Sequence, residues 1–156
     1  MPRINTLDFG ATDSATAGIQ EAIDALPESG GTVVLPAGTF RLRRSVRLKS
    51  RVTLRGEGAA TVLTRPPEFS TPLAQDLPAQ ETRAVLAEVT GLMVGDEICI
   101  CDDEEGGWHM RHGIIRSIQD RTLDLELLVS KPELPYLRAR KAQASNRSLV
   151  QPAPPR

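Results

Sequence analysis

Residues 30–40 read GGTVVLPAGTF, and a second run at residues 52–56 reads VTLRG. In and between these runs apolar residues alternate with polar ones, which is the period of strands buried on one face. Glycine and proline supply the corners. Such short strands cannot bury an apolar face alone, so neighbouring turns of chain must stack on them, as in a solenoid. The apolar positions form three pairs: Phe40 and Leu42, Val46 and Leu48, and Val52 and Leu54.

An amphipathic helix is expected just before the first run, over residues 14–26. Asp13 or Ser14 is placed to cap its first N–H groups, and Pro27 with the glycines that follow ends it. A helix of about 13 residues is not stable alone in water, so its apolar stripe must cover the open end of the strands. This stripe, at helical spacing, consists of Ile19, Ala22, Ile23 and Leu26.

The order of these elements resembles the N-terminal cap of the pectate-lyase-like right-handed parallel β-helix family, which includes epimerase-like pectate lyases, polygalacturonases and phage tailspikes. The motifs that carry the resemblance are INxxDFGA at residues 4–11, the helix and the two strand runs. The resemblance covers residues 1–65 and implies a mainly β chain that starts a right-handed parallel β-helix behind an N-terminal capping helix. It also implies a lineage that cleaves, epimerises or binds acidic polysaccharides.

The second half of the chain predicts a different β structure. A Pro-rich linker is expected at residues 66–83, and residues 84–135 alternate in short runs typical of an antiparallel β-meander. This meander resembles the small β-insert of many epimerase-like pectate lyases, but the VGD run at residues 94–96 also occurs in SH3-like barrels. The alternatives are therefore a non-enzymatic SH3-like binding module and an assembly cap that completes another β-helix chain. Residues 136–156 are expected to be a disordered or truncated tail. The expected strands are residues 84–89, 97–101, 108–118 and 122–128.

Composition excludes several classes of partner. The formal net charge is −1, which gives no pull toward nucleic acid, and no apolar run approaches the length of a membrane span. No signal peptide precedes the family motif, so the chain as written would start in the cytoplasm, although relatives are typically extracellular or virion-associated. Cys99 and Cys101 are expected to be packed or half-exposed free thiols, because a bond between residues two apart on a strand is strained.

The resemblance implies a polysaccharide lyase or glycoside hydrolase, but the sequence lacks the catalytic motifs of such enzymes. Hydrolases of the family use paired carboxylates that flank the glycosidic bond, within Asn-Thr-Asp, Gly-His-Gly and Arg-Ile-Lys motifs that do not occur here. The neighbouring Asp102 and Asp103 are expected on a solvated acidic loop. The sequence therefore predicts no catalytic residue and a chain that is not catalytic by itself.

The metal-binding residue types are present without the usual spacing. Cys99 and Cys101 are too close in sequence for a structural zinc site, and His109 and His112 would face opposite sides of a strand. Asp102 and Asp103, with the two glutamates after them, offer oxygen ligands but lack the spacing of a calcium loop, so calcium is a weak candidate. No other cofactor is expected.

A row of basic residues is the best functional candidate. These residues are expected at outward positions on successive strands, where residues 41–65 hold only one acid, Glu57. A guanidinium matches a carboxylate or sulfate with two hydrogen bonds, which favours an acidic polysaccharide as ligand; the alternative is a solvated face. Trp108 is a candidate for stacking on a sugar, with a core position as its alternative. The basic row consists of Arg41, Arg43, Arg47, Lys49, Arg51 and Arg55.

The far edge of the first rung is expected to be apolar, around Val52, Leu54, Val62 and Leu63. An exposed strand edge of this kind favours association, because unpaired backbone groups and apolar side chains lie side by side. The β-insert, a second copy of the chain or a longer β-helix partner are the three candidates to cover it.

Overall fold

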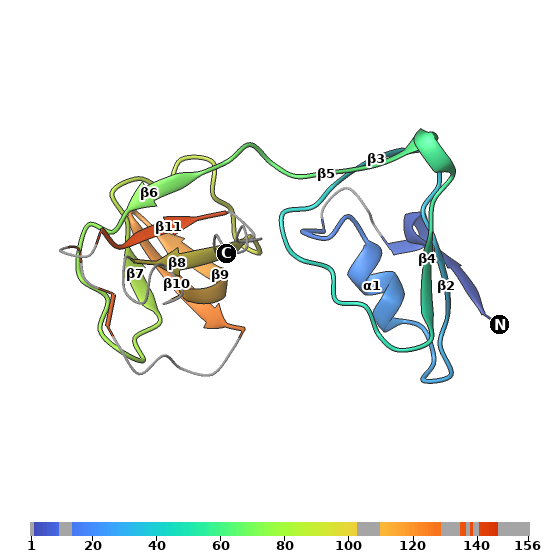
Figure 1. Cartoon of the computed structure of the whole chain (residues 1–156), viewed down its shortest axis with the longest axis horizontal. Coiled ribbons are helices and arrows are strands. Elements are labelled where there is room, and N and C mark those ends of the chain that lie inside the picture. The colour runs from blue at the N-terminus through green and yellow to red at the C-terminus, as the bar shows by residue number, and fades with distance from the viewer. Residues whose placement is uncertain are drawn as a thin grey trace, which may run out of the picture. The chain divides into compact units, whose positions relative to one another are not determined.

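The structure is a computed structural model, and it describes residues 2–9, 14–102, 110–128, 135, 136, 138 and 141–146. The chain divides into two compact units, Met1–Pro67 and Glu68–Arg156 (Figure 1). Among the described residues there is one α-helix, and most other regular structure is strand. The mainly β class predicted from the sequence is confirmed.

The first unit contains two small parallel sheets. One has the strand order β1-β2-β4 and the other consists of β3 and β5. In the larger sheet Val33 lies between Ile4 and Leu54, so apolar side chains are in register across its three strands. The strands are β1 (Arg3–Asn5), β2 (Gly31–Val34), β3 (Gly38–Arg41), β4 (Val52–Arg55) and β5 (Thr61–Thr64).

The helix α1 (Ile19–Asp24) packs on the core of this unit. All four residues of the predicted stripe are buried, together with Val33 and Phe40 from the strands, because only this arrangement removes the apolar face of so short a helix from water. Two 3-10 helices, η1 (Thr6–Phe9) and η2 (Gly58–Ala60), complete the unit.

The helix is shorter than predicted. It begins at Ile19 because Ala17 and Gly18 have φ angles of 52° and 75°, in the left-handed region that a right-handed helix excludes. The predicted cap by Ser14 is therefore wrong: its hydroxyl accepts a hydrogen bond from the backbone N–H of Thr16 instead, at 3.0 Å. Asp13 lies outside the described residues.

The strand predicted around Val46 and Leu48 is also wrong. This stretch is a loop, and Leu48 is 63% exposed. The backbone N–H of Arg47 donates to the side-chain oxygen of Gln20 on α1 at 2.8 Å, so it pairs with a side chain where a strand would pair with a neighbouring backbone.

The second unit is one antiparallel sheet with the order β6-β11-β8-β9-β10-β7. It curls so far that its two edge strands meet through a bridge between Leu73 and Leu86 and through the bond from Ala74 N–H to the Val85 carbonyl, at 2.8 Å. The predicted meander is confirmed as β8-β9-β10, with its tight turn at Asp120 and Arg121. The strands are β6 (Ser70–Pro72), β7 (Arg83–Val85), β8 (Glu97–Cys101), β9 (Met110–Gln119), β10 (Thr122–Leu127) and β11 (Gln143–Ser145).

Two segments predicted to lack strands contribute to this sheet. β6 lies within the predicted linker and β11 within the predicted tail, and the two pair with each other. They are held there because apolar residues of both segments are buried in the same core, among them Leu73, Leu77 and Ala144. None of the helices in the described part of the chain is long and apolar enough to cross a membrane.

Candidate functional site

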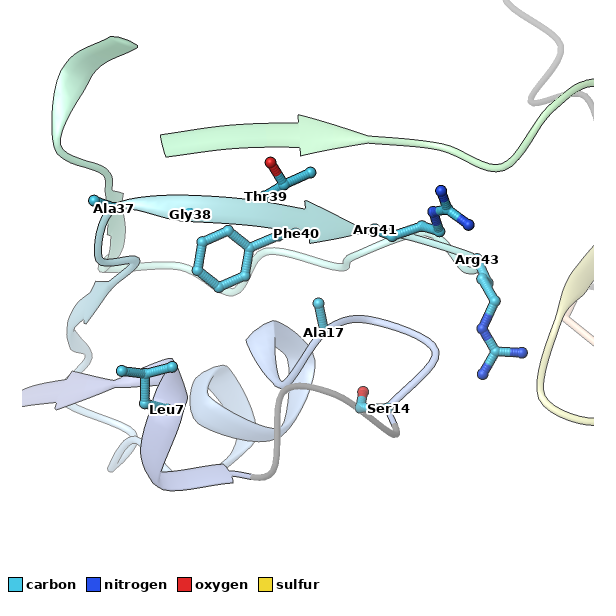
Figure 2. Close-up of a pocket in the computed structure, with 9 residues that line it drawn as sticks. All are labelled: Leu7, Ser14, Ala17, Ala37, Gly38, Thr39, Phe40, Arg41 and Arg43. Atoms are coloured by element: carbon cyan, nitrogen blue, oxygen red, sulfur yellow. The ribbon is translucent and has the colours of Figure 1, made fainter. Parts of the chain in front are cut away.

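A pocket of about 350 Å³ lies in the first unit, alongside β3 (Figure 2). One wall is β3 itself, with Ala37 before it and Arg43 after it. The other wall is formed by Leu7 of η1 and by Ser14 and Ala17, which precede α1. The pocket therefore joins three segments that are separated in sequence.

Side chains alternate in direction along β3, so the strand contributes both an apolar and a polar lining to the pocket. Phe40 points inward and is 6% exposed, whereas its neighbours Thr39 and Arg41 are exposed. Gly38 opens the strand with a φ of 147°, which favours glycine, and the atom nearest to a Cβ built there would be a Phe40 ring carbon at 4.0 Å. A larger residue at position 38 would strain the backbone at the edge of the pocket.

Backbone hydrogen bonds hold the basic end of the pocket. The N–H of Leu42 donates to the Thr64 carbonyl at 2.8 Å, and the N–H of Arg43 donates to the Ala15 carbonyl at 2.8 Å. These bonds connect the end of β3 to β5 on one side and to the turn before α1 on the other. Arg41 and Arg43 therefore project from a backbone whose position is set before any ligand arrives.

The Glu21 carboxylate holds the turn that forms the opposite wall of the pocket. The hydroxyls of Ser14 and Thr16 each donate to one oxygen of Glu21, both at 2.7 Å. Burial raises the pKa of Glu21, but the hydrogen bonds from Ser14 and Thr16 outweigh it, so the pKa is lowered and the carboxylate is ionised at neutral pH. This network fixes the turn on which Ser14 and Ala17 reach the pocket.

The predicted basic row is not one row on successive strands. Only Arg41 and Arg55 lie in strands, and these belong to different sheets. Arg47 and Lys49 lie in the loop before β4, and Arg51 has a φ of 62° in the turn that enters it. Of the six residues of the predicted row, the pocket is lined by Arg41 and Arg43.

Lys49 has a structural partner. Its ammonium lies 2.7 Å from the Asp24 carboxylate, with both side chains about half exposed. The hydrogen bond from Lys49 is the main cause that lowers the pKa of Asp24. An exposed pair of this kind contributes roughly 0–1 kcal/mol, so Lys49 tethers the loop to α1 only weakly.

The acidic candidate in the second unit is not solvated as predicted. Asp102 is 4% exposed, directly after β8, and its charge is among the causes that raise the pKa of Tyr136. Asp103, Trp108 and His109 lie outside the described residues. In the described part of the chain no group of three or more His, Cys, Asp or Glu side chains is placed to hold a metal.

The thiols and the imidazole lie on one face of the sheet, since Cys99 is opposite His112 in the β8–β9 register. Cys99 is buried and Cys101 half-buried, both as free thiols, in agreement with the sequence. A hydrogen bond with Cys101 and burial both raise the pKa of Cys99, so this thiol stays protonated and is a poor nucleophile. His112 Nδ1 lies 3.6 Å from a Glu97 carboxylate oxygen.

The sequence analysis did not identify Arg111 as a buried residue. It is 4% exposed, and one of its terminal nitrogens donates to the backbone carbonyl of Glu81. The signal was available in the strand period, since Arg111 has the same parity as the inward-facing Gly113. Burial lowers the pKa of Arg111, but the group lies against Tyr136 rather than in a cavity.

Residues 3–82 match the model of the family described as rhamnogalacturonase A/epimerase, pectate lyase-like. The match covers just over half of the sequence and includes every strand of the first unit. The chain belongs to this pectate-lyase-like family. No curated protein matches the chain.

Three solved structures similar to the chain are phage tailspikes. The gp61 tailspike of Pseudomonas phage phi297 has a TM-score of 0.44 at 15% identity over 92% of this chain and 32% of its own. Gp54 of Acinetobacter baumannii bacteriophage AP22, solved in complex with A. baumannii capsular saccharide, has a TM-score of 0.41 at 12% identity over 92% and 27%. Tailspike gp49 of Pseudomonas phage LKA1 has 0.38 at 18% identity over 83% and 24%. The chain thus spans at most about a third of these proteins.

Proposed function

We propose that this chain forms the N-terminal cap, first rung and β-insert of a pectate-lyase-like β-helix protein that binds or cleaves an acidic polysaccharide. The observation that carries the proposal is the family match, because residues 3–82 contain the five strands and the α-helix described in the first unit. We propose further that this activity is that of the whole protein, and that the protein is located outside cells or on a virion.

The arrangement of the first unit supports the β-helix part of this proposal. Its strands pair in parallel, β1 with β2, β2 with β4 and β3 with β5, as the stacked turns of a solenoid must. The buried stripe of α1 packs on β2 and on Phe40, where a capping helix would cover the end of such a stack. The register of these pairs would continue if a further turn of chain added to β4 and β5.

The charge of the first unit supports an acidic ligand. Arg41, Arg47 and Arg55 are exposed, and each presents a guanidinium that can bind a carboxylate or a sulfate. Among the described residues that line the pocket beside β3 none is acidic. An acidic polysaccharide would therefore meet positive charge over several parts of this unit.

The chain alone is proposed to lack the catalytic step. Cleavage in this lineage requires a carboxylate pair or a base beside the sugar, and neither lines the described part of the pocket. Asp102 is buried, which does not suit contact with a polymer. The parts of the protein that would supply such groups are proposed to lie outside this sequence.

A binding or assembly module is the second candidate, on the evidence of the second unit. Its curled sheet encloses its own core, which includes Leu86, Ile100 and Leu123, and a unit with its own core can act as an independent SH3-like module. In this second candidate function, the second unit binds a partner protein and the first unit caps a β-helix.

Affinity for polymers tests the proposal. Electrophoresis of the whole chain through gels that contain polygalacturonate, alginate or rhamnogalacturonan should retard it more than a gel with neutral dextran. Incubation with the same polymers, with and without calcium, should give neither unsaturated products nor new reducing ends. Equal migration in all gels would overturn the polysaccharide proposal, and turnover by the chain would overturn its non-catalytic part.

A further inference from the structure

We propose that the free edge of β3 is a docking site for an extended segment of a partner polypeptide, which adds to β3 as a further strand. The segment would carry apolar and acidic residues in alternation. This inference rests on the backbone of β3 and does not depend on the polysaccharide function proposed above.

The two parallel sheets of the first unit are unequal on the side of this edge. Each turn of chain gives one strand to each sheet, first β2 and β3, then β4 and β5. In the larger sheet β1 pairs with β2 on the side away from β4. Among the described residues no strand takes the corresponding place beside β3, and the pocket formed with Leu7, Ser14 and Ala17 lies there. The pocket therefore occupies the place of a missing strand.

Two hydrogen bonds fix which way the backbone of β3 faces. The N–H of Leu42 donates to the Thr64 carbonyl of β5 at 2.8 Å, and the N–H of Arg43 donates to the Ala15 carbonyl, on the other side, at 2.8 Å. In a parallel pair, successive residues direct their N–H and C=O groups to opposite sides of the strand. The alternate residues that precede Arg43 therefore face away from β5, toward the pocket.

These alternate residues are Thr39 and Arg41, and their backbone groups are open. Within the part of the chain that the structure describes, neither backbone makes a hydrogen bond on this side of β3. Both residues are exposed. An added strand would find an N–H donor and a C=O acceptor at each of the two positions, which is the arrangement that binds extended peptides to sheet edges.

The two faces of β3 set the sequence that the segment needs. Phe40 is buried, and its ring lies on the side of Ala17 and Leu7 (Figure 2), whereas Arg41 points to the opposite face of the strand. A side chain of an added strand lies on the same face as its direct neighbour on β3. The residue beside Phe40 would therefore be apolar and the residue beside Arg41 acidic, so one segment in strand conformation meets both faces.

Charge favours a partner polypeptide over a second copy of this chain. Arg41 makes no ion pair with any described residue, and no described residue that lines the pocket is acidic. The five strands described in the first unit contain no acidic residue, so the edge strands of a second copy offer nothing to pair with Arg41. A segment with aspartate or glutamate at alternate positions does so.

Hydrogen exchange measured by NMR on the whole 156-residue chain tests the site. The probe is a short capped peptide in which valine alternates with aspartate. We expect it to slow exchange at the amides of Thr39 and Arg41 by at least about tenfold, because pairing removes them from water. Exchange at Leu63, whose N–H faces the free edge of β5, should not change. The same peptide with lysine in place of aspartate should bind at least about tenfold more weakly.

A pair of proline variants compares the two free edges of the sheet. Thr39→Pro removes a donor from the edge of β3 without removing a β3–β5 hydrogen bond, and it should weaken peptide binding by at least about tenfold. Leu63→Pro is the matched control, since it removes a donor from the edge of β5 and should change binding less than about twofold. Arg41→Gln should weaken binding by up to about fivefold. Circular dichroism should show that all three variants are folded.

Methylated peptides repeat the test without changing the protein. Methylation of one alternate set of peptide amides should abolish binding, and methylation of the other set should change it less than about twofold, because only one set faces β3. Equal effects of the two sets, equal effects of the two proline variants, or a peptide that leaves Thr39 and Arg41 unprotected would overturn the site. Protection that rises with protein concentration in the absence of peptide would assign the edge to a second copy and refute the partner.

Discussion

The guanidinium carbon of Arg111 lies 5.0 Å from the centroid of the Tyr136 ring. Arg111 also donates to the carbonyl of Glu81, and Tyr136 exchanges two backbone hydrogen bonds with Leu77, each 2.8 Å long. These contacts of Arg111 and Tyr136 therefore connect β9 with two segments that are distant in sequence, one before the meander and one after it. These are the segments that the sequence predicted to be a linker and a tail.

Arg111→Ala should destabilise the second unit by about 2–4 kcal/mol, because it removes both the cation–π contact and the packing of the arginine stem. Arg111→Met keeps the packing and leaves no charge to bury, so its effect should be under about 1.5 kcal/mol. Urea unfolding measures both. Arg116→Ala on the same strand is the control, since its ion pair with Glu126 is on the surface and should contribute under about 1 kcal/mol. Equal effects of Arg111→Ala and Arg116→Ala would show that the contact is not structural.

Ile23→Asp should unfold the first unit. Ile23 is fully buried on the apolar stripe of α1, and a carboxylate there would have no partner in a core of apolar side chains. Asp24→Ala, at the next and exposed position, should cost less than about 1 kcal/mol because it removes only the exposed pair with Lys49 and an exposed hydrogen bond from Gln20. Circular dichroism and protease sensitivity of residues 1–67 distinguish the two variants. A well-folded Ile23→Asp chain would contradict the packing of α1.

The pKa of Glu21 makes the first unit sensitive to acid. Its folded pKa lies below its ordinary value of 4.5, so the stabilisation is fully present above about that pH and is lost as pH falls through the lower, folded pKa. Glu21→Gln should flatten the fall in unfolding free energy over this window. Thr16→Val removes one of the two hydroxyl donors and should shift the fall toward higher pH. An unchanged pH profile in both variants would show that the network does not hold the carboxylate.

Self-association is expected through the free edge of β5. Val62 and Leu63 on this strand are 47% and 48% exposed, and within the described residues β5 pairs with β3 alone. Such an edge can add a strand from a second copy of the chain or from a longer β-helix partner. Sedimentation at micromolar concentration should detect an oligomer that Leu63→Lys dissociates, with Leu48→Lys in the exposed loop as the control. A wild-type chain that remains a monomer would contradict the expectation.

Local signals predicted much of this fold. The helical spacing of Ile19, Ala22, Ile23 and Leu26 predicted the buried face of α1, and strand alternation predicted β4, β8 and the hairpin of β9 and β10. These elements depend on residues that are close in sequence, so period and turn chemistry suffice. The predicted start of α1 was wrong because an alanine side chain does not indicate the left-handed backbone that Ala17 adopts.

The candidate site was predicted less well, for a physical reason. The sequence identified the basic residues but grouped six of them, because it assigned a strand to the loop that carries Arg47. It had no means of placing Leu7 and Ser14 in the same pocket as Arg41, since that arrangement depends on how two sheets and a helix close around one core.

The sequence by itself determined the family, the one α-helix of the described residues and the alternating strands, since each follows from residue types at short and regular spacing. Only the tertiary structure decided which edges meet, that β6 pairs with β11 across more than half of the second unit's length, and that Asp102 is buried. These features depend on the burial of apolar residues shared by distant segments, which no local pattern records. The pocket beside β3 has the same origin, because its basic and apolar walls become one site only when the core of the first unit has formed.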